Sequence, residues 1–263
     1  MEVNYKEIAR QARIKVLEMI YKAQTSHIGS NFSCIDIMAV LFEKIDLYKD
    51  KFILSKGWAA ASLYYFLWKK GRITEEELDS YCQEGSKFIG LAEPVHPDIP
   101  FAGGSMGYGL PAGVGFALAK KLKGEEGKVY VLMSDGEMQI GTTWESALIA
   151  AHHKLDNLVV IVDYNHFQAM GKTNEILNIE PLVEKWKAFG WGNIRTDGHN
   201  FDKLNVALKY QEAFRKPDAP YIIITHTVKG KGVSFMENDN RWHYLNISKE
   251  DYEKAKDELD KGI

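Results

Sequence analysis

Two polar clusters in the middle of the chain, Ser134–Glu137 and Asp163–Asn165, contain residue types that bind metal ions. Each follows a short apolar run, Val129–Met133 and Leu158–Val162 respectively, that has the length and composition of a buried strand. Between them, Thr142–His153 has the pattern of a helix. The stretch therefore predicts a βαβ unit. Because ligands of open parallel sheets bind at the carboxyl ends of the strands, we expect both clusters to meet at one site.

One aspartate and one asparagine in these clusters predict the chemistry of the site. Asp135 offers a carboxylate and Asn165 an amide oxygen, hard ligands that suit Mg²⁺ or Ca²⁺ rather than zinc. Diphosphate oxygens, a backbone carbonyl and water would complete the coordination. Gly136 lets the backbone approach a phosphate, and the start of the following helix favours negative charge. Taken singly, Asp135 is a candidate helix cap and Asn165 a turn residue, but together they favour a metal–diphosphate site.

This stretch resembles the thiamine diphosphate signature of the transketolase family, in which Gly-Asp-Gly is followed further along the chain by an asparagine. Ser134 stands in place of the first glycine, and Asp163-Tyr164-Asn165 stands where the family has Asp-Asp-Asn or Asn-Asn. The resemblance implies that Mg²⁺ or Ca²⁺ is bound by Asp135, Asn165 and the backbone oxygen of Phe167. It implies further contacts with thiamine diphosphate at Gly136, Glu137 and Asn165.

Three histidines lie in motifs that resemble catalytic motifs of the family. His27 lies in Ser-His-Ile-Gly, similar to the family's Ser-Gly-His-Pro-Gly loop, and the resemblance implies that it faces the thiazolium ring and the substrate. A histidine that caps the end of the first helix is the structural alternative. His96, in a His-Pro pair, is implied to contact the sugar, and His243, in a Trp-His pair, the diphosphate end and the substrate. His199 is expected to be structural.

Three aromatic residues depart from the family pattern. In DKFILSKGW, which resembles the family's D-R-F-I-L-S-K-G-H, Trp58 replaces a histidine that lies against the cofactor diphosphate. It either forms a flat wall in the site or points into the core. Tyr108 replaces a glutamine in a loop resembling G-S-L-G-Q-G, whose backbone at Gly104 and Met106 is implied to hold the aminopyrimidine ring. Tyr244 replaces a glycine after the Trp-His pair.

An acidic path between paired active sites is also altered. The family has a glutamate four residues after Gly-Asp-Gly, and Ile140 occupies this position, whereas Glu145, a further member of the path, is present. Isoleucine cannot relay a proton, so the resemblance predicts that the path is interrupted or rerouted.

Gly107–Ala112 also fits the G-x-G-x-x-A pattern of a dinucleotide-binding fold. That pattern requires a preceding strand, and the Gly- and Pro-rich segment before it does not have the composition of a strand. We therefore discount this interpretation.

Length and composition bound the class of protein. With 263 residues, 45% of them hydrophobic, the chain can form one large α/β domain over residues 1–263. A net charge of −3 gives no indication of nucleic-acid binding. Cys34 and Cys82 are expected to be free thiols in a reducing compartment, with a single disulfide as the less favoured alternative. Without an apolar run of transmembrane length or a signal-peptide core, we expect no membrane association and a cytoplasmic location.

The fold class predicted is α/β, a parallel sheet with helices on both faces. Beyond the central unit, helices are expected over 4–23, from Ser33, over 60–69, over 74–84 with a Thr74–Glu77 capping box, over 181–189, from 201 and from 248. Strands are expected over 50–57 and 221–227, and a loop over 90–107.

The resemblance covers nearly the whole chain but only the amino-terminal, diphosphate-binding part of a full transketolase. It implies a split enzyme whose partner is a separate pyrimidine-domain subunit, expected as α2β2. This enzyme is expected to transfer a two-carbon ketol unit from a ketose to an aldehyde or keto-sugar acceptor, with a small sugar or sugar-nucleotide as substrate. The aromatic exchanges leave open a decarboxylating, acyl-transferring or sugar-branching thiamine enzyme. A regulatory paralogue without catalysis is the third alternative, and the intact histidines and metal ligands argue against it.

Overall fold

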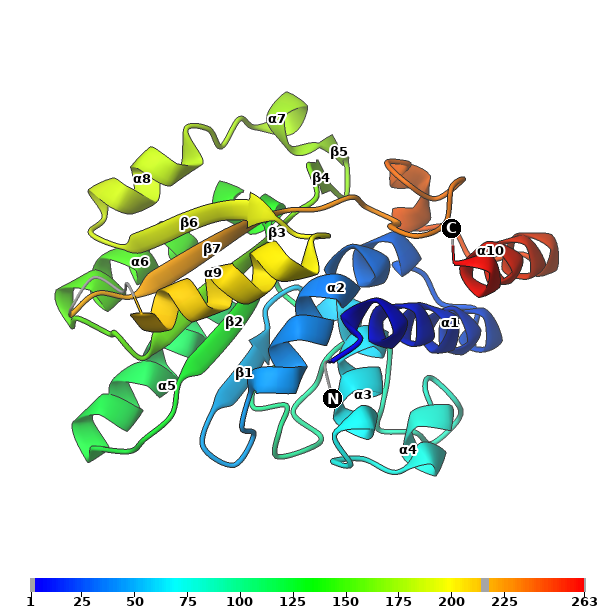
Figure 1. Ribbon diagram of the computed structural model, residues 1–263, viewed down its shortest axis with the longest axis horizontal. Helices are drawn as coiled ribbons and strands as arrows, with labels where there is room; N and C mark the ends of the chain where they lie inside the picture. The colour runs from blue at the N-terminus through cyan, green and yellow to red at the C-terminus, as the bar shows by residue number, and fades with distance from the viewer. Residues whose placement is uncertain (1–2, 214–217, 263) are drawn as a thin grey trace.

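The computed structural model describes residues 3–213 and 218–262, and its centre is a five-stranded parallel sheet (Figure 1). The strands lie in the order β1 (Lys51–Leu54), β2 (Val129–Ser134), β3 (Leu158–Tyr164), β7 (Tyr221–His226) and β6 (Gly192–Asp197). Every residue of β3, at the centre, is buried. This burial on both faces explains why the strand reads as a continuous apolar run.

Helices cover both faces of the sheet. On one side of the sheet lie α2 (Ile28–Lys44), α3 (Ala60–Lys69) and α9 (Phe201–Ala213), with α1 (Tyr5–Ala23) packed on α2 and α3. On the other side lie α5 (Gly109–Lys123), α6 (Gly141–His152) and α8 (Leu182–Ala188). Successive strand residues point to opposite faces. Thus Leu132 and Ile161 join the first core, and Val131 and Val160 join the second. The predicted fold class is confirmed.

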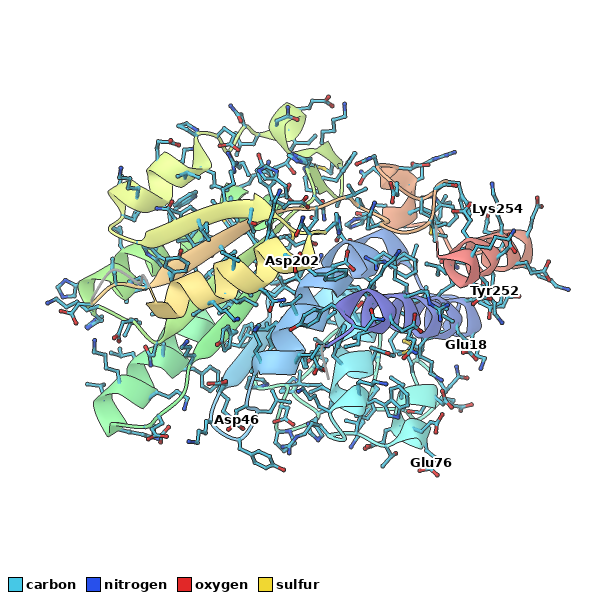
Figure 2. The ribbon with its side chains drawn as sticks, in the orientation of Figure 1. Glu18, Asp46, Glu76, Asp202, Tyr252 and Lys254 are labelled. Atoms are coloured by element: carbon cyan, nitrogen blue, oxygen red, sulfur yellow. The ribbon has the colours of Figure 1, made fainter. Side chains whose placement is uncertain are left out.

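Short elements surround the carboxyl edge of the sheet and one flank of the molecule. They are η1 (Gly57–Ala59), α4 (Glu75–Asp79), η2 (Asp135–Gln139), β4 (Phe167–Gln168), β5 (Gly171–Lys172), α7 (Thr173–Ile176) and η3 (Asn240–His243). The last helix, α10 (Lys249–Lys261), lies beside α1, where Tyr252 stacks on Tyr21 with ring centroids 4.3 Å apart. Charged side chains such as Asp46, Glu76 and Lys254 point outward (Figure 2).

Most of the predicted elements are present. The βαβ unit, the first helix, the Thr74–Glu77 capping box and the loop before Tyr108 are confirmed. The helix expected over 74–84 ends at Asp79, and Cys82 has a left-handed φ of 53°. α5 and the edge strand β6 were not predicted.

The prediction that Ser33 caps the second helix is wrong. α2 begins at Ile28, and its N-cap is His27, in the left-handed region with a φ of 71°. The Ser33 hydroxyl instead donates to the Asp163 carboxylate at 2.6 Å. The alternative that His27 caps the first helix is also wrong, because α1 ends at Ala23 and Gln24 is its C-cap.

The register of β2 and β3 brings the two polar clusters together. Ser134 pairs with Asp163 at the carboxyl ends of these adjacent strands, so Asp135 and Asn165 leave the sheet at the same edge. Across residues 3–213 and 218–262, none of the helices combines the length and apolar composition needed to cross a membrane.

Candidate cofactor and metal site

Asp135 forms the buried base of the site. Its side chain is fully buried and accepts hydrogen bonds from the Thr173 hydroxyl at 2.8 Å and the Gly136 N–H at 3.0 Å. Among the described residues it forms no ion pair. Burial raises the pKa of this carboxyl to about 7. A divalent cation beside Asp135 would favour the ionised carboxylate. The buried carboxylate has no positively charged partner within ion-pair distance among the described residues, and a metal ion would supply that positive charge.

Asn165 and Phe167 supply the other oxygens of the predicted metal site. The Asn165 amide nitrogen donates to the Ser33 hydroxyl at 3.3 Å and to Asp163 at 3.4 Å. The amide oxygen accepts the Phe167 N–H at 3.0 Å, which fixes the turn that carries the Phe167 carbonyl. The described residues contain no cluster of three or more His, Cys, Asp or Glu suited to a metal ion. A carboxylate, an amide and a carbonyl fit Mg²⁺ or Ca²⁺ that takes its remaining ligands from a diphosphate.

A buried ion pair, which the sequence did not predict, holds Asn165 in place. Lys56 forms an ion pair with Asp163, whose other oxygen accepts the Thr227 hydroxyl. Burial alone would raise the pKa of Asp163, but Lys56 outweighs it and holds the pKa below its usual range. Lys56 also donates to the Ser30 carbonyl at 2.8 Å. Lys56 lies in the segment Ser-Lys-Gly-Trp, which resembles a family motif. This motif is the feature of the sequence from which a role for Lys56 could have been predicted.

A second buried lysine, Lys229, reaches the site from the loop after β7. It donates to the Asn240 amide oxygen at 2.6 Å and lies 2.9 Å from Nδ1 of His243. Burial, and the neighbouring charge of Lys56, lower its pKa to about 8. Of the two lysines, Lys56 lines the cavity while paired with Asp163, and Lys229 lies behind His243.

A cavity of about 400 Å³ opens beside Ser134 and Asn165. Asp135, which is fully buried, follows Ser134 in the chain but does not itself line the cavity. Many of the predicted site residues line this cavity. The lining comprises His27, Ser30, Lys56, Gly57, Trp58, Gly103, Met106, Ser134, Asn165, Phe167, Gln168, Ala169, His243 and Tyr244. The lining residues come from the loops and helix starts at the carboxyl edge of the sheet, where the βαβ unit predicts ligand binding.

Four aromatic rings form one wall of this cavity. Trp58 stacks on His27 with centroids 4.8 Å apart and planes 13° apart, and it remains 44% exposed. His27 meets the ring of His243 edge-on at 4.7 Å, and Tyr244 lies against both histidines. The alternative that Trp58 points into the core is therefore wrong.

Both histidines of the wall are neutral near pH 7. Burial, together with Lys229 and Lys56, lowers the pKa of His27 to about 4 and that of His243 to about 3. Nδ1 of His27 lies 2.7 Å from the Ser26 hydroxyl. The Lys229 ammonium can only donate, so Nδ1 of His243 accepts and the proton of this ring lies on Nε2. The Ser26 hydroxyl can donate to Nδ1 of His27 in the same way, which leaves Nε2–H of His27 available to a ligand.

Glu137, Gly136 and Gly104 do not line the cavity. The Glu137 carboxylate is fully buried and accepts hydrogen bonds from Ser55, from the Ser134 N–H at 2.7 Å and from the Gly107 N–H at 3.1 Å. It therefore joins three loops of the site instead of facing a ligand. Gly136 is buried, and a Cβ at this position would lie 3.1 Å from the Gln168 Cβ.

His96 lies outside the cavity lining in the isolated chain. Its Nδ1 accepts the Asp98 N–H at 3.2 Å, and Asp98 in turn pairs with Arg72 at 2.5 Å. A contact between His96 and a sugar substrate stays a prediction.

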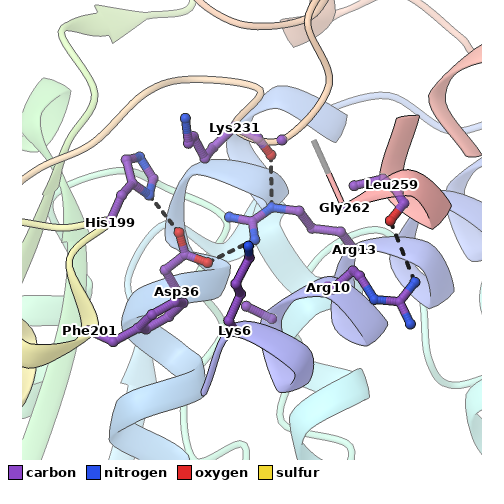
Figure 3. A pocket seen from close by; sticks show the side chains of 11 residues that line it. Lys6, Arg10, Arg13, Asp36, His199, Phe201, Lys231, Leu259 and Gly262 are labelled. Atoms are coloured by element: carbon purple, nitrogen blue, oxygen red, sulfur yellow. Dashed lines mark hydrogen bonds and ion pairs between the residues drawn. The ribbon is translucent and has the colours of Figure 1, made fainter. Parts of the chain in front are cut away.

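His199 has the structural role expected of it (Figure 3). Its Nδ1 lies 2.7 Å from Asp36, and its Nε2 accepts the Val228 N–H at 2.8 Å. Asp36 also pairs with Arg13 at 2.8 Å, and Arg13 donates to the Lys231 carbonyl at 2.8 Å. The cluster ties α1 and α2 to the loop that carries Lys229.

The fold and this geometry define a class, namely an α/β domain that binds a diphosphate cofactor through a divalent metal at the carboxyl edge of a parallel sheet. Comparison with known proteins gives the family. Residues 4–261 match the family described as transketolase, thiamine diphosphate binding domain. The chain belongs to the transketolase family of ketol-transferring enzymes, whose cofactors are thiamine diphosphate and a divalent metal such as Mg²⁺ or Ca²⁺.

Individual relatives support this assignment. The chain is 35% identical to one subunit of the apulose-4-phosphate transketolase of Phocaeicola vulgatus, with all of this chain and 96% of that protein covered. It is 34% identical to a 6-deoxy-6-sulfo-D-fructose transketolase subunit of Clostridium sp., with 99% of this chain and 98% of that protein covered. A transketolase structure from Campylobacter jejuni superposes with a TM-score of 0.90 at 28% identity, and our chain covers 43% of its length.

Proposed function

We propose that this chain is the diphosphate-binding subunit of a two-chain transketolase, active only with a separate pyrimidine-domain subunit. The observation that supports this proposal most directly is the share of each relative's length that the chain covers. The chain spans 96% of a relative that is named as one transketolase subunit, but only 43% of a one-chain transketolase. Residues 1–263 act as a single domain in this proposal. A location in the reducing cytoplasm is supported by the two free thiols, Cys34 and Cys82.

Exposed apolar side chains on α6 and in the loop that reaches the cavity support a partner chain. Leu148 and Ile149 on α6 are 58% and 47% exposed, and Tyr108 and Met106, beside the cavity, are 53% and 40% exposed. Neighbouring exposed apolar side chains of this kind are typical of protein interfaces. We infer an α2β2 assembly in which the partner closes the cavity from this side.

The chain's own residues have distinct roles in the proposed reaction. When bound, thiamine diphosphate supplies the nucleophilic carbon that accepts the ketol unit. Asp135, Asn165 and the Phe167 carbonyl would hold the metal, and Lys56, which lines the cavity, would lie beside the diphosphate. His27 and His243, neutral and with Nε2–H toward the cavity, donate hydrogen bonds to substrate oxygens. The aromatic wall excludes water from one side of the reacting atoms.

The substrate is proposed to be a bulky or otherwise unusual sugar, as opposed to the small linear sugar phosphates of central metabolism. Trp58 carries no positive charge and presents a large apolar face where the family pattern has a histidine. Two relatives that cover the chain almost fully are named for unusual sugars, apulose 4-phosphate and 6-deoxy-6-sulfo-D-fructose.

Reconstitution tests the proposal. This chain and its pyrimidine-domain partner are purified separately and mixed, and ketol transfer is followed from 3-hydroxypyruvate and from xylulose 5-phosphate. We expect activity only in the mixture, and slow turnover of xylulose 5-phosphate with ribose 5-phosphate. Full activity of this chain alone would refute the two-chain assignment. Turnover of that phosphate pair near ~10 s⁻¹, a typical enzyme rate, would refute the specialised substrate.

A further inference from the structure

A second, smaller cavity lies on the other side of the His27–Trp58 pair. Its volume is about 220 Å³, and it shares only His27 and Trp58 with the cofactor cavity. The other residues that line it are Gln24, Thr25, Ser26, Tyr81, Gly90 and Asn246. The two stacked rings therefore border both a cavity suited to a cofactor and a cavity with no assigned ligand.

The lining of the second cavity is polar but uncharged. The Thr25 and Tyr81 hydroxyls, which both belong to the lining, are hydrogen-bonded to each other at 3.4 Å. The Gln24 amide nitrogen donates to the Tyr21 and Ile247 carbonyls, at 2.8 and 3.1 Å, which leaves its oxygen as an acceptor without a donor among the described residues. Asn246 is exposed, and its side chain has no hydrogen-bond partner among the described residues. Among the residues that the structure describes, no Lys, Arg, Asp or Glu lines this cavity.

We propose that this second cavity binds the hydroxyl-bearing carbons of the sugar substrate beyond the transferred ketol unit. The inference rests on the proposed transketolase function, because only then does a sugar start at the cofactor cavity. Hydroxyl groups both donate and accept hydrogen bonds, which matches a mixed lining of hydroxyls and amides. The exposed face of Trp58 gives the C–H side of the same carbons an apolar surface along the path between the cavities.

The lining also restricts the kind of sugar. Phosphate and diphosphate groups are bound in proteins mainly by Arg, Lys and backbone N–H groups, and this cavity offers no cationic side chain. Any charged end of the substrate is therefore bound outside it. The ligand of the second cavity is an uncharged polyhydroxylated chain, which disfavours a nucleotide diphosphate at this position.

Kinetics of the assembled enzyme provide the first test. Thr25→Val keeps the shape of the side chain and removes its hydroxyl, and the second variant adds Asn246→Ala. D-xylulose, a five-carbon ketose, can reach the second cavity, whereas 3-hydroxypyruvate carries the same ketol unit and ends at the carboxylate. Relative to 3-hydroxypyruvate, we expect KM for D-xylulose to rise about threefold in the single variant and about tenfold in the double variant. Tyr48→Phe, on an exposed turn that lines neither cavity, is the control.

Direct binding decides the inference independently of turnover. Saturation-transfer NMR with the non-reacting polyol D-arabinitol should show binding to the assembled enzyme, with a signal lost in the double variant and kept in the control. Equal arabinitol signals in all three proteins, or equal KM changes for both donors, would overturn the inference. If the enzyme transfers no ketol unit from any donor, the proposed function fails, and the arabinitol measurement still shows whether the second cavity binds polyols.

Discussion

Trp58 is the single residue at which the chain departs most clearly from the family pattern inside the cavity. It stacks on His27 and keeps 44% of its surface exposed. A histidine here would donate to a phosphate oxygen, and a charge-assisted bond contributes about 1.5–3 kcal/mol. Trp58→His should therefore tighten thiamine diphosphate binding about tenfold and accelerate turnover of small sugar phosphates. Trp58→Phe, which keeps a flat apolar ring, is the matched control and should gain neither property. Calorimetry and initial rates measure both effects, and equal behaviour of the two variants would contradict the assigned role.

Lys229 supports a second prediction at this scale, which has a spectroscopic readout. Burial comes first among the causes that lower the pKa of His243 to about 3, and the Lys229 charge comes second. Lys229→Met keeps the length of the side chain and removes the charge, so the pKa of His243 should rise toward its ordinary value. NMR titration of the His243 ring protons measures this pKa.

Lys231→Met is the control, since Lys231 pairs with Glu237 at 3.0 Å and does not line the cavity. An unchanged pKa of His243 in the Lys229 variant would show that the lysine charge does not act on this ring.

Among the secondary-structure elements, the cluster of Arg13, Asp36 and His199 joins α1, α2 and the loop after β7. Burial alone would raise the pKa of Asp36, but Arg13 and His199 together lower it to about 2, below the ordinary value of 3.8. Because the folded-state pKa is depressed, the stabilisation is complete above about pH 4 and is lost as the pH falls toward 2. The shift corresponds to about 2 kcal/mol of unfolding free energy.

Asp36→Asn should therefore lower the unfolding free energy at pH 7 by about 3 kcal/mol, because it leaves a buried guanidinium without its counter-charge. The difference from the unmodified chain should shrink between pH 4 and pH 2. Urea unfolding at several pH values measures it, with the exposed Asp257→Asn as control. A difference that stays constant over this range would contradict the ion-pair explanation.

Periodicity in the sequence was enough to predict most elements but not all their ends. The strands β2, β3 and β7 are buried on both faces and give uninterrupted apolar runs. β6 lies at the edge of the sheet with half-exposed residues, so its sequence, Gly-Asn-Ile-Arg-Thr-Asp, carries no such run. The start of α2 was misplaced because its N-cap, His27, makes no side-chain capping bond and Ser33 had the residue type of a cap.

In the whole molecule, the position of Ile140 bears on communication between two active sites. Ile140 packs against Gly107, where a Cβ would lie 2.6 Å from its Cγ2, while Glu145 is exposed on α6. An apolar side chain cannot relay a proton between these points. We therefore expect the assembled enzyme to bind two equivalents of thiamine diphosphate with equal, independent affinities. A titration with two clearly different binding steps would contradict this expectation, and Ile140→Glu would then be the variant that should alter them.

The site as a whole could be predicted only in part from the sequence. Asp135 and Asn165 were identified because each ends a recognisable strand, and His27, Trp58, Met106 and His243 lie in motifs that resemble family motifs. Lys56 and Asp163 lie in motifs that the sequence analysis quoted, but their roles were missed because these come from a buried ion pair between the two residues. Lys229 was missed because its role comes from burial beside His243. His96 lies in a motif that resembles a family motif, but the structure places it outside the cavity lining.

Binding of the cofactor and metal to the assembled two-chain enzyme tests the central claim most directly. Calorimetric titration with thiamine diphosphate and Mg²⁺ is performed on the unmodified enzyme, on Asp135→Ala and on the control Asp257→Asn. Asp135 is the only carboxylate among the proposed ligands, so Asp135→Ala should abolish saturable binding of both while the fold and the partner contact persist. The control should bind as the unmodified enzyme does. Unchanged affinity of Asp135→Ala for thiamine diphosphate and Mg²⁺ would contradict the assignment of this edge of the sheet as the cofactor site.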